Sequence, residues 1–333
     1  MDAAPAAVGA AADGSERLPR ERVLALDIGG TKLAAGVVDG DGRVLSFVVE
    51  PTRSEEGAEP VLERLFALGR AAVAEAAVPW GEVAAVGIAC GGPLDSERGV
   101  LIAPPHLTGW RDVPIVELAE QALERPAALE NDATAAAAGE HAWGAGAGTR
   151  NMVYLTLSTG VGGGVVVDGR LLRGSRGNGA ELGHVTVDWH GRPCRGCGRR
   201  GCLEAYVSGT SIAERAREAG LDVARAEDVQ EAARHGDPVA TAVWDETIEA
   251  LGCGLTSIVN VFEPERVVVG GGVSRAGEEL LAGPRAAVEA SAISPGGRAV
   301  DVVTASFGDR VGVVGAAAIV RDRTALAAGV AGG

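Results

Sequence analysis

The chain carries one local pattern twice. In residues 23–49, short apolar runs are separated by a Gly-Gly turn and an Asp-Gly turn. The second copy has an apolar run at 152–158, a glycine turn at 159–164, an apolar run at 165–167, Asp168-Gly169 and a further short run. Each copy is typical of a three-stranded antiparallel unit. The repetition predicts an internal duplication, with two related α/β halves and a crevice between them that is suited to a ligand.

The other segments alternate between helical and buried-strand patterns, as an α/β fold requires. Residues 1–21 are small, polar or proline-bearing and predict a disordered tail. We expect one domain over 22–130 with 311–330, and a second over 131–310. The predicted helices are 60–77, 115–123, 132–143, a helical region over 210–262, and 311–327, which should pack back on the first domain; the further strands are 83–89, 127–129 and 266–272.

Length and charge exclude several classes of protein. The chain has 333 residues, enough for two domains, and 45 acidic against 30 basic residues give a formal charge of -15. Repulsion from a phosphate backbone argues against a nucleic-acid partner. No apolar stretch approaches the roughly 18–20 residues that cross a bilayer, and the start lacks a signal-peptide pattern. We therefore expect a cytoplasmic protein without a membrane partner.

Three glycine turns are suited to binding phosphate. The first, Asp27-Ile28-Gly29-Gly30-Thr31-Lys32, combines close backbone approach with a carboxylate, a hydroxyl and an ammonium group. The second spans 158–164 and the third 270–274. An ordinary Gly-Gly hairpin is the alternative for the first. The chain has no P-loop, because its one lysine follows a threonine, and G-x-G-x-x-G fails at Val165.

Glu130-Asn131-Asp132 lies between a short predicted strand and an alanine-rich helix. An Asp or Asn at such a position commonly caps the helix. The alternative is catalytic, since a carboxylate beside an amide can accept a hydroxyl proton during phosphoryl transfer to an alcohol.

His184 and three cysteines have the spacing of a tetrahedral zinc site: Cys194, Cys197 and Cys202. Four protein ligands would close the shell, so the predicted zinc is structural. A metal-free glycine loop and a rival ligand, His190, are the alternatives. The same zinc site would hold the side chains of Glu181 and Glu204 towards the crevice, unless both are solvated surface charges.

The remaining cysteines and histidines receive no chemical role. Cys90 and Cys253 lie in apolar surroundings, which is typical of small core residues. His106, His141 and His235 lack partners at ligand spacing and are interpreted as surface or core histidines.

Six motifs in order resemble the ROK (repressor, open reading frame, kinase) family over about residues 22–320: DIGGTK, ENDATAAAAGE, LSTGVGGG, GAELGH, CxxCGxxGCLEAY and VVVGGGVS. The resemblance implies an actin-like ATPase (ribonuclease H-like) fold with a central cleft. It also implies ATP-dependent phosphorylation of a hexose, ATP with Mg²⁺ and structural Zn²⁺ as cofactors, and a homodimer or homotetramer.

Residue by residue, the resemblance makes Asp132 the catalytic base. It assigns sugar binding to Asn131, Asp132, Glu181, His184 and Glu204, with Gly92 on the sugar side. In the family the histidine also ligates zinc with the three cysteines. The nucleotide set is Asp27 facing Mg²⁺, Gly30, Thr31 and Lys32 in the phosphate hairpin, Thr159 and Gly160 in the second turn, and Gly271 and Gly272 nearby.

Three segments depart from the family pattern. The cysteines follow C-x-x-C-x4-C where many members have C-x-C-x4-C; residues 90–93 read Cys-Gly-Gly-Pro, and 104–106 read Pro-Pro-His. The last two lie on the sugar side in relatives, so they bear on which sugar is used. We expect a glucokinase acting on the 6-hydroxyl, with N-acylmannosamine, fructose or allose kinase, or a sugar-responsive regulator without kinase activity, as alternatives. Polyphosphate as the donor is disfavoured by the cysteine cluster.

Overall fold

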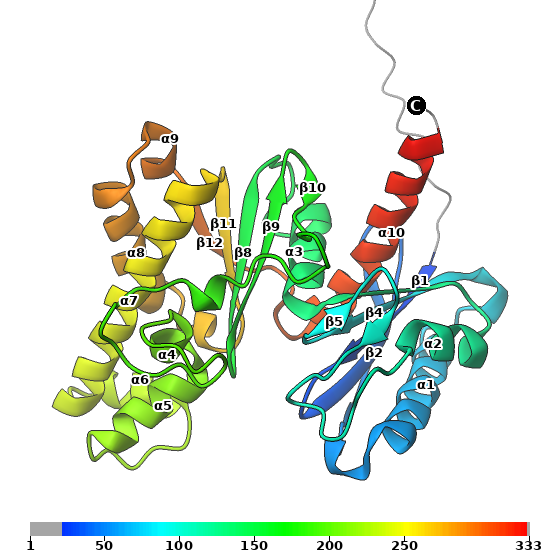
Figure 1. Cartoon of the computed structure of the whole chain (residues 1–333), viewed down its shortest axis with the longest axis horizontal. Coiled ribbons are helices and arrows are strands. Elements are labelled where there is room, and N and C mark those ends of the chain that lie inside the picture. The colour runs from blue at the N-terminus through cyan, green and yellow to red at the C-terminus, as the bar shows by residue number, and fades with distance from the viewer. Residues whose placement is uncertain (1–21, 332–333) are drawn as a thin grey trace, which may run out of the picture.

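The computed structural model describes residues 22–331, and the side chains of residues 22–323; the tail predicted for 1–21 lies outside the described residues. The described part contains two five-stranded sheets with matching strand order (Figure 1). In each sheet three antiparallel strands are followed by two parallel ones. The matching order confirms the predicted duplication.

The first sheet has the order β3-β2-β1-β4-β7 and the second β10-β9-β8-β11-β12. The first consists of β1 (Arg22–Ile28), β2 (Lys32–Val38), β3 (Val44–Pro51), β4 (Val83–Cys90) and β7 (Ala127–Asn131). The second consists of β8 (Met152–Leu157), β9 (Val161–Val167), β10 (Arg170–Leu171), β11 (Arg266–Gly270) and β12 (Asp301–Thr304). A short hairpin, β5 (Leu94–Asp95) and β6 (Val100–Leu101), follows β4.

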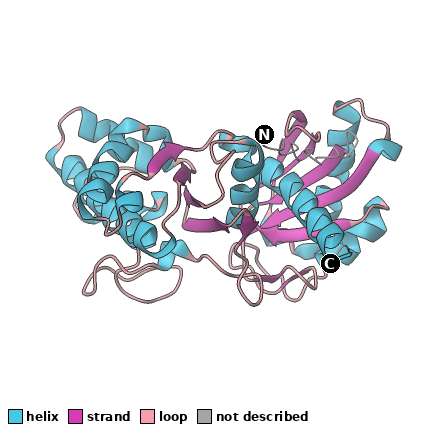
Figure 2. Cartoon of the chain, turned by 90° about the horizontal axis from the view of Figure 1, so that it is seen from above, coloured by secondary structure: helices cyan, strands magenta, loops and turns pink. Residues whose placement is uncertain are grey.

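Helices cover the faces of both sheets (Figure 2). On the first sheet, Leu24 and Leu26 pack in one core with α1 and α2, whereas Ala25 packs on the opposite face with α3 and α10. This alternation follows from the two-residue period of a strand. The helices are α1 (Ala58–Glu75), α2 (Ile115–Leu123), α3 (Asp132–Trp143), α4 (Glu204–Val207), α5 (Gly209–Glu218), α6 (Ala226–Arg234), α7 (Pro238–Phe262), α8 (Glu278–Ser291), α9 (Pro295–Arg298) and α10 (Val311–Ala331).

Helix α10 packs on the first sheet and on α3, as predicted from the apolar pattern of 311–327. The two helices approach closely because small residues line their contact. A Cβ atom added at Gly315 would lie 2.4 Å from the backbone of Ala135, and one at Gly139 would lie 3.0 Å from the backbone nitrogen of Gly315. In Figure 1, α3 lies between the two sheets.

The predicted glycine turn at 159–164 is wrong in extent. The turn ends at Gly160, and the next three glycines belong to strand β9. Their lack of a side chain makes room for neighbours: a Cβ at Gly162 would lie 2.8 Å from that of Ala133, and one at Gly164 would lie 2.4 Å from that of Ala137. These glycines therefore allow α3 to lie directly on the strand.

The helical region predicted for 210–262 is interrupted twice. Gly220 and Gly236 have φ of 95° and 81°, in the left-handed region that ends helices, and they follow α5 and α6. Asp237 caps α7 by accepting from two backbone N–H groups, and Pro238 follows it at the first helical position. Within residues 22–331, no helix has both the length and the apolar character to cross a bilayer.

Replacement of Gly87 in β4 by alanine is expected to lower the free energy of unfolding by at least about 2 kcal/mol, since overpacking forces neighbours apart. The added Cβ would lie 1.8 Å from the carbonyl oxygen of Ala316 in α10, a backbone atom that cannot rotate away. Thermal and denaturant unfolding would measure the change. Gly81→Ala is the control, because no heavy atom lies within 4 Å of the added methyl group. Equal stability of the two variants would contradict this packing.

Candidate active site

The turn between β1 and β2 is held from several sides. The Gly29 N–H donates to the carbonyl of Lys32 at 3.0 Å, and the Thr52 hydroxyl donates to the carbonyl of Gly29 at 2.6 Å. The Thr52 N–H donates to the carbonyl of Thr31 at 3.1 Å. The predicted Gly-Gly hairpin is therefore present, with its residues in a fixed geometry.

Asp27 lies at the end of β1, against the first turn of α10. A Cβ atom added at Gly312 would lie 2.1 Å from its Oδ2. Burial, and to a smaller extent the nearby Asp132 carboxylate, raise the pKa of Asp27 to about 7 against the opposing effect of Lys32. A cation beside this carboxylate would favour its ionised form, which fits a metal-facing role.

Asn131 and Asp132 lie where β7 passes into α3. The Asn131 side chain caps the helix, since its Oδ1 accepts from the Ala133 and Thr134 N–H groups at 3.0 and 3.2 Å. Asp132 accepts one further bond through Oδ1, from the Ala133 N–H at 2.8 Å. Within the described residues, its Oδ2 has no protein hydrogen-bond partner. The capping role thus falls to Asn131, and Asp132 retains a carboxylate oxygen for another partner.

Burial raises the pKa of Asp132, against the effects of the Ala133 N–H and the charge of His106. The charge of Asp132 in turn contributes to raising the pKa of Asp27 and of Glu181, whose own shifts come mainly from burial. The charge of Glu204 also raises the pKa of Glu181, and His184 opposes this shift. The structure therefore brings the predicted base, the predicted metal-facing carboxylate and the predicted sugar-binding set into one electrostatic neighbourhood.

Gly92 lies between two amide side chains. A Cβ added there would lie 3.5 Å from Oδ1 of Asn178 and 3.7 Å from Nδ2 of Asn131. Asn178 also donates to the carbonyl of Leu94 at 2.9 Å. Sequence reasoning missed Asn178; its place in the GNGAELGH stretch, three residues before Glu181, was the available signal.

His106 was interpreted as a surface or core histidine, yet it lies beside this site. Its side chain lies against Gly91, which follows β4, and against the first glycine turn: a Cβ at Gly91 would lie 2.6 Å from its Cε1, and one at Gly30 would lie 3.0 Å from its Cβ. Burial lowers its pKa, and Asp132 opposes the shift. The departure from the family pattern at 104–106 was the signal for this residue.

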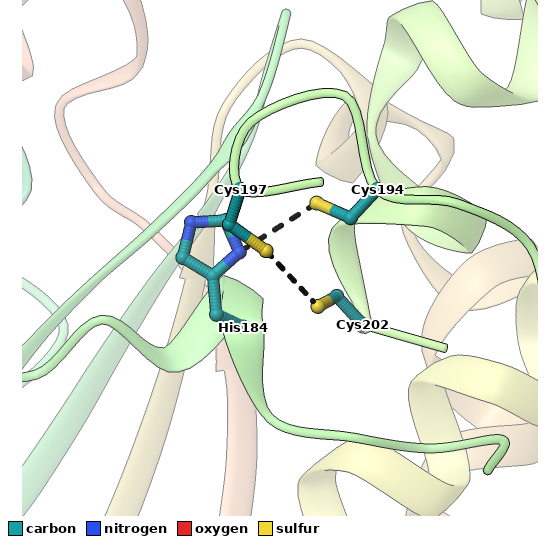
Figure 3. Close-up of side chains that lie close together, drawn as sticks. All are labelled: His184, Cys194, Cys197 and Cys202. Atoms are coloured by element: carbon teal, nitrogen blue, oxygen red, sulfur yellow. Dashed lines mark hydrogen bonds between the residues drawn. The ribbon is translucent and has the colours of Figure 1, made fainter. Parts of the chain in front are cut away.

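The predicted zinc ligands converge (Figure 3). The ligand atoms of His184, Cys194, Cys197 and Cys202 all lie within 4.8 Å of one another. Two separations are 3.7 Å, from Cys194 Sγ to His184 Nδ1, and 3.5 Å, between the Cys197 and Cys202 sulfurs. Ligands in a tetrahedral zinc shell lie roughly 3.5–3.8 Å apart for its usual bond lengths. Geometry and donor chemistry both fit zinc, with His184 rather than the exposed His190 in the cluster.

Glu204 connects this cluster to the second glycine turn. Its Oε1 accepts from the Cys194 thiol at 3.3 Å, and its Oε2 accepts from the Val161 N–H at 3.0 Å.

The prediction for Cys90 as a core residue is confirmed, whereas that for Cys253 is wrong, because this thiol is exposed on α7. The helix turns that side of its surface to solvent.

A pocket of about 320 Å³ lies beside the second and third turns. Ser158, Thr159 and Gly272, which belong to the turns predicted to bind the nucleotide, line it. Gly271 has a φ of 87° and lies against the backbone of Leu157, which joins the third turn to β8. Val273, from the third turn, also lines the pocket. Sequence reasoning missed the remaining lining residues, which come from α5, the segment before α6 and the start of α6: Gly209, Thr210, Ala213, Arg217, Ala224, Arg225, Ala226 and Glu227.

Comparison with known proteins finds relatives and solved structures that are similar over most of this chain. A glucokinase of Thermotoga maritima is 38% identical over 322 residues, covering 92% of this chain and 99% of the relative. A ROK hexokinase of Thermus thermophilus has a TM-score of 0.78 at 42% identity, covering 89% of this chain and 97% of its own. A ROK glucokinase of Streptomyces griseus, solved with glucose and AMPPNP, has a TM-score of 0.74 at 36% identity, with coverages of 90% and 98%.

These structural similarities identify the duplicated sheets as the predicted actin-like ATPase fold. The family model described as "ROK family" matches residues 23–323, which include both sheets and the cysteine cluster. The chain therefore belongs to the ROK family.

Proposed function

We propose that the protein is an ATP-dependent hexose kinase that phosphorylates the 6-hydroxyl of glucose. The observation that carries this proposal is the carboxylate oxygen of Asp132 that accepts no hydrogen bond within the described residues, in a group whose charge acts on Asp27 and Glu181. The relatives named glucokinase support glucose as the acceptor. The glucose and AMPPNP present in the Streptomyces griseus structure support the same pair of substrates.

Asp132 is the general base in this mechanism. Its Oδ1 is held by the Ala133 N–H, and its Oδ2 accepts the proton of the 6-hydroxyl as the hydroxyl oxygen attacks the γ-phosphorus of ATP. The bond from that phosphorus to the β,γ-bridging oxygen breaks, and ADP leaves. Burial raises the pKa of Asp132, which makes the carboxylate a better proton acceptor. Asn131 is rigid because it also caps α3, so it can orient a sugar hydroxyl beside the base.

We place the phosphates of ATP against the backbone of Gly30 and Thr31, with Lys32 compensating their charge. Asp27 would hold Mg²⁺, which neutralises charge on the transferring group. The pocket beside Thr159 and Gly272 would take the adenosine, with Gly160 and Gly271 at its phosphate end. The acidic Glu227 in its lining is a suitable acceptor for ribose hydroxyls.

The sugar would lie among Asn131, Asp132 and Gly92 on one side and Glu181, His184 and Glu204 on the other. Zinc bound by His184 and the cysteines would fix the orientation of that imidazole, as a structural metal does for its ligands. In this arrangement the two domains are 22–130 with 311–330, and 131–310, and they close over the sugar to exclude water.

A coupled ADP-release assay with Mg-ATP tests this function. We expect sugar-dependent turnover, fastest with glucose, in a panel containing mannose, fructose, allose, N-acetylglucosamine and N-acetylmannosamine. Product analysis should locate the phosphate on the 6-oxygen. Faster turnover of N-acetylmannosamine would correct the acceptor but retain the kinase. Folded, zinc-loaded protein that turns over none of these sugars would contradict the proposal and favour a sugar-binding regulator.

A further inference from the structure

Glu130, the residue before Asn131, is a fully buried carboxylate with 0% exposure. A buried charge is costly unless it is paired and hydrogen-bonded. Its Oε1 accepts from the Asn131 N–H at 3.2 Å, and its Oε2 accepts from Nε of Arg173 at 2.7 Å. Glu130 thus contacts the backbone of a predicted sugar-binding residue and forms an ion pair with Arg173, while Arg323 lies near enough for its pKa to respond to the Glu130 charge.

Arg173 reaches a second element through the other end of its guanidinium. Its Nη2 donates to Asp322 Oδ2 of α10 at 2.7 Å. The next residue, Arg323, donates to the carbonyls of Leu129 and Ser96, both at 2.8 Å. Side chains of α10 therefore fasten the end of β7 and the β5 hairpin, and Arg173 joins this network from the segment after β10.

The backbone of Arg173 also shapes the loop that leads to Glu181. Its carbonyl accepts from the Gly179 N–H at 2.9 Å, and a Cβ added at Gly179 would lie 3.0 Å from the Arg173 backbone. This bond closes a loop over 173–179, which carries Asn178 against Leu94 and Gly92. Arg173 thus binds the loop through its main-chain carbonyl and binds strand β7 through its side chain.

Building on the proposed function, we propose that Arg173 is a positioning residue that sets the distance between the sugar ligands of the 173–184 segment and those at the end of β7. It is not one of the residues predicted to bind the sugar or the nucleotide, and it does not line the pocket beside Thr159. Its loss should let Glu181 and His184 shift relative to Asn131 and Asp132, which alters sugar binding and turnover together. The nucleotide pocket is lined by other segments, so ATP binding should stay unchanged.

The test measures glucose and ATP kinetics for Arg173→Met. We expect the KM for glucose to rise and kcat to fall, each by at least about tenfold, with the KM for ATP within about twofold of wild type. The KM for glucose and kcat of Arg173→Lys should lie between those of the wild type and of Arg173→Met. An ammonium group keeps the charge, but it lacks the planar, forked set of donors with which guanidinium binds two carboxylates. Arg150→Met is the matched control, since it removes an exposed pair with Asp168 and should change neither constant.

A double variant, Glu130→Gln with Arg173→Met, separates positioning from stability. It removes the uncompensated buried charge, so it should recover thermal stability while its KM for glucose stays raised. This variant also gives the answer if Arg173→Met alone does not fold.

A folded Arg173→Met or double variant with wild-type KM for glucose would overturn the role of Arg173. Equal rises in the KM for glucose and for ATP would do the same, because they indicate general loosening. Wild-type protein that phosphorylates no hexose would instead overturn the proposed function itself.

Discussion

Asp132→Asn is expected to lower kcat for glucose phosphorylation by about 10²–10⁴-fold, the usual contribution of a general base. The amide keeps the shape of the side chain, and its oxygen can still accept from the Ala133 N–H, so α3 should begin as in the wild type. It cannot accept the proton of the 6-hydroxyl. Single-turnover and steady-state ADP release would measure the loss.

Sugar binding should survive this substitution, because Asn131 and the zinc-side ligands remain. Calorimetric titration with glucose is therefore expected to give an affinity within about tenfold of wild type. Asn131→Asp is an informative comparison, since it retains an N-cap acceptor and alters the sugar-facing amide. Near wild-type turnover in Asp132→Asn would exclude this residue as the base.

Cys197→Ser is expected to lose most of the bound zinc, where the wild type should contain about one zinc per chain. The KM for glucose should rise about 10–100-fold, the range seen when the support of a metal site is removed. The reason is local: His184 is itself one of the four ligands and Glu204 lies beside the Cys194 sulfur, so the loss of the metal should loosen two predicted sugar ligands together. Metal analysis and glucose kinetics measure the two effects.

Cys253→Ser is the matched control, because this exposed thiol on α7 lies outside the cluster. It should leave zinc content and glucose kinetics unchanged. Metal-free protein with unaltered affinity for glucose would show that the cluster does not position the sugar ligands.

Local pattern predicted much of the fold because the information was local. Short apolar runs and turn dipeptides mark the β1–β3 unit, and the apolar pattern of 311–327 indicates a helix that packs back on the first domain. The cluster of His184 with three cysteines was equally visible, since the four ligands lie within a span of 19 residues.

What the sequence did not reveal depends on partners that are distant along the chain. The sequence of the β9 glycines is typical of a turn. The reason for their small size is the close contact with Ala133 and Ala137 of α3, which only the structure reveals. Arg173 and Glu130 are separated by 43 positions, and the motif that contains Glu130 gives no indication of this partner. His106 acquires its surroundings from two turns that precede it by 15 residues or more.

The tight packing of α3 bears on how this enzyme could acquire a new acceptor. The helix that begins with the proposed base lies against the glycines of β9 on one side and Gly315 of α10 on another, and added methyl groups at these contacts would overlap neighbouring atoms. Mutations along α3 would mostly cost folding before they changed selectivity. Libraries for altered acceptor choice should therefore vary His106 and Asn178, which lie on loops beside the same base and can change size without displacing a helix.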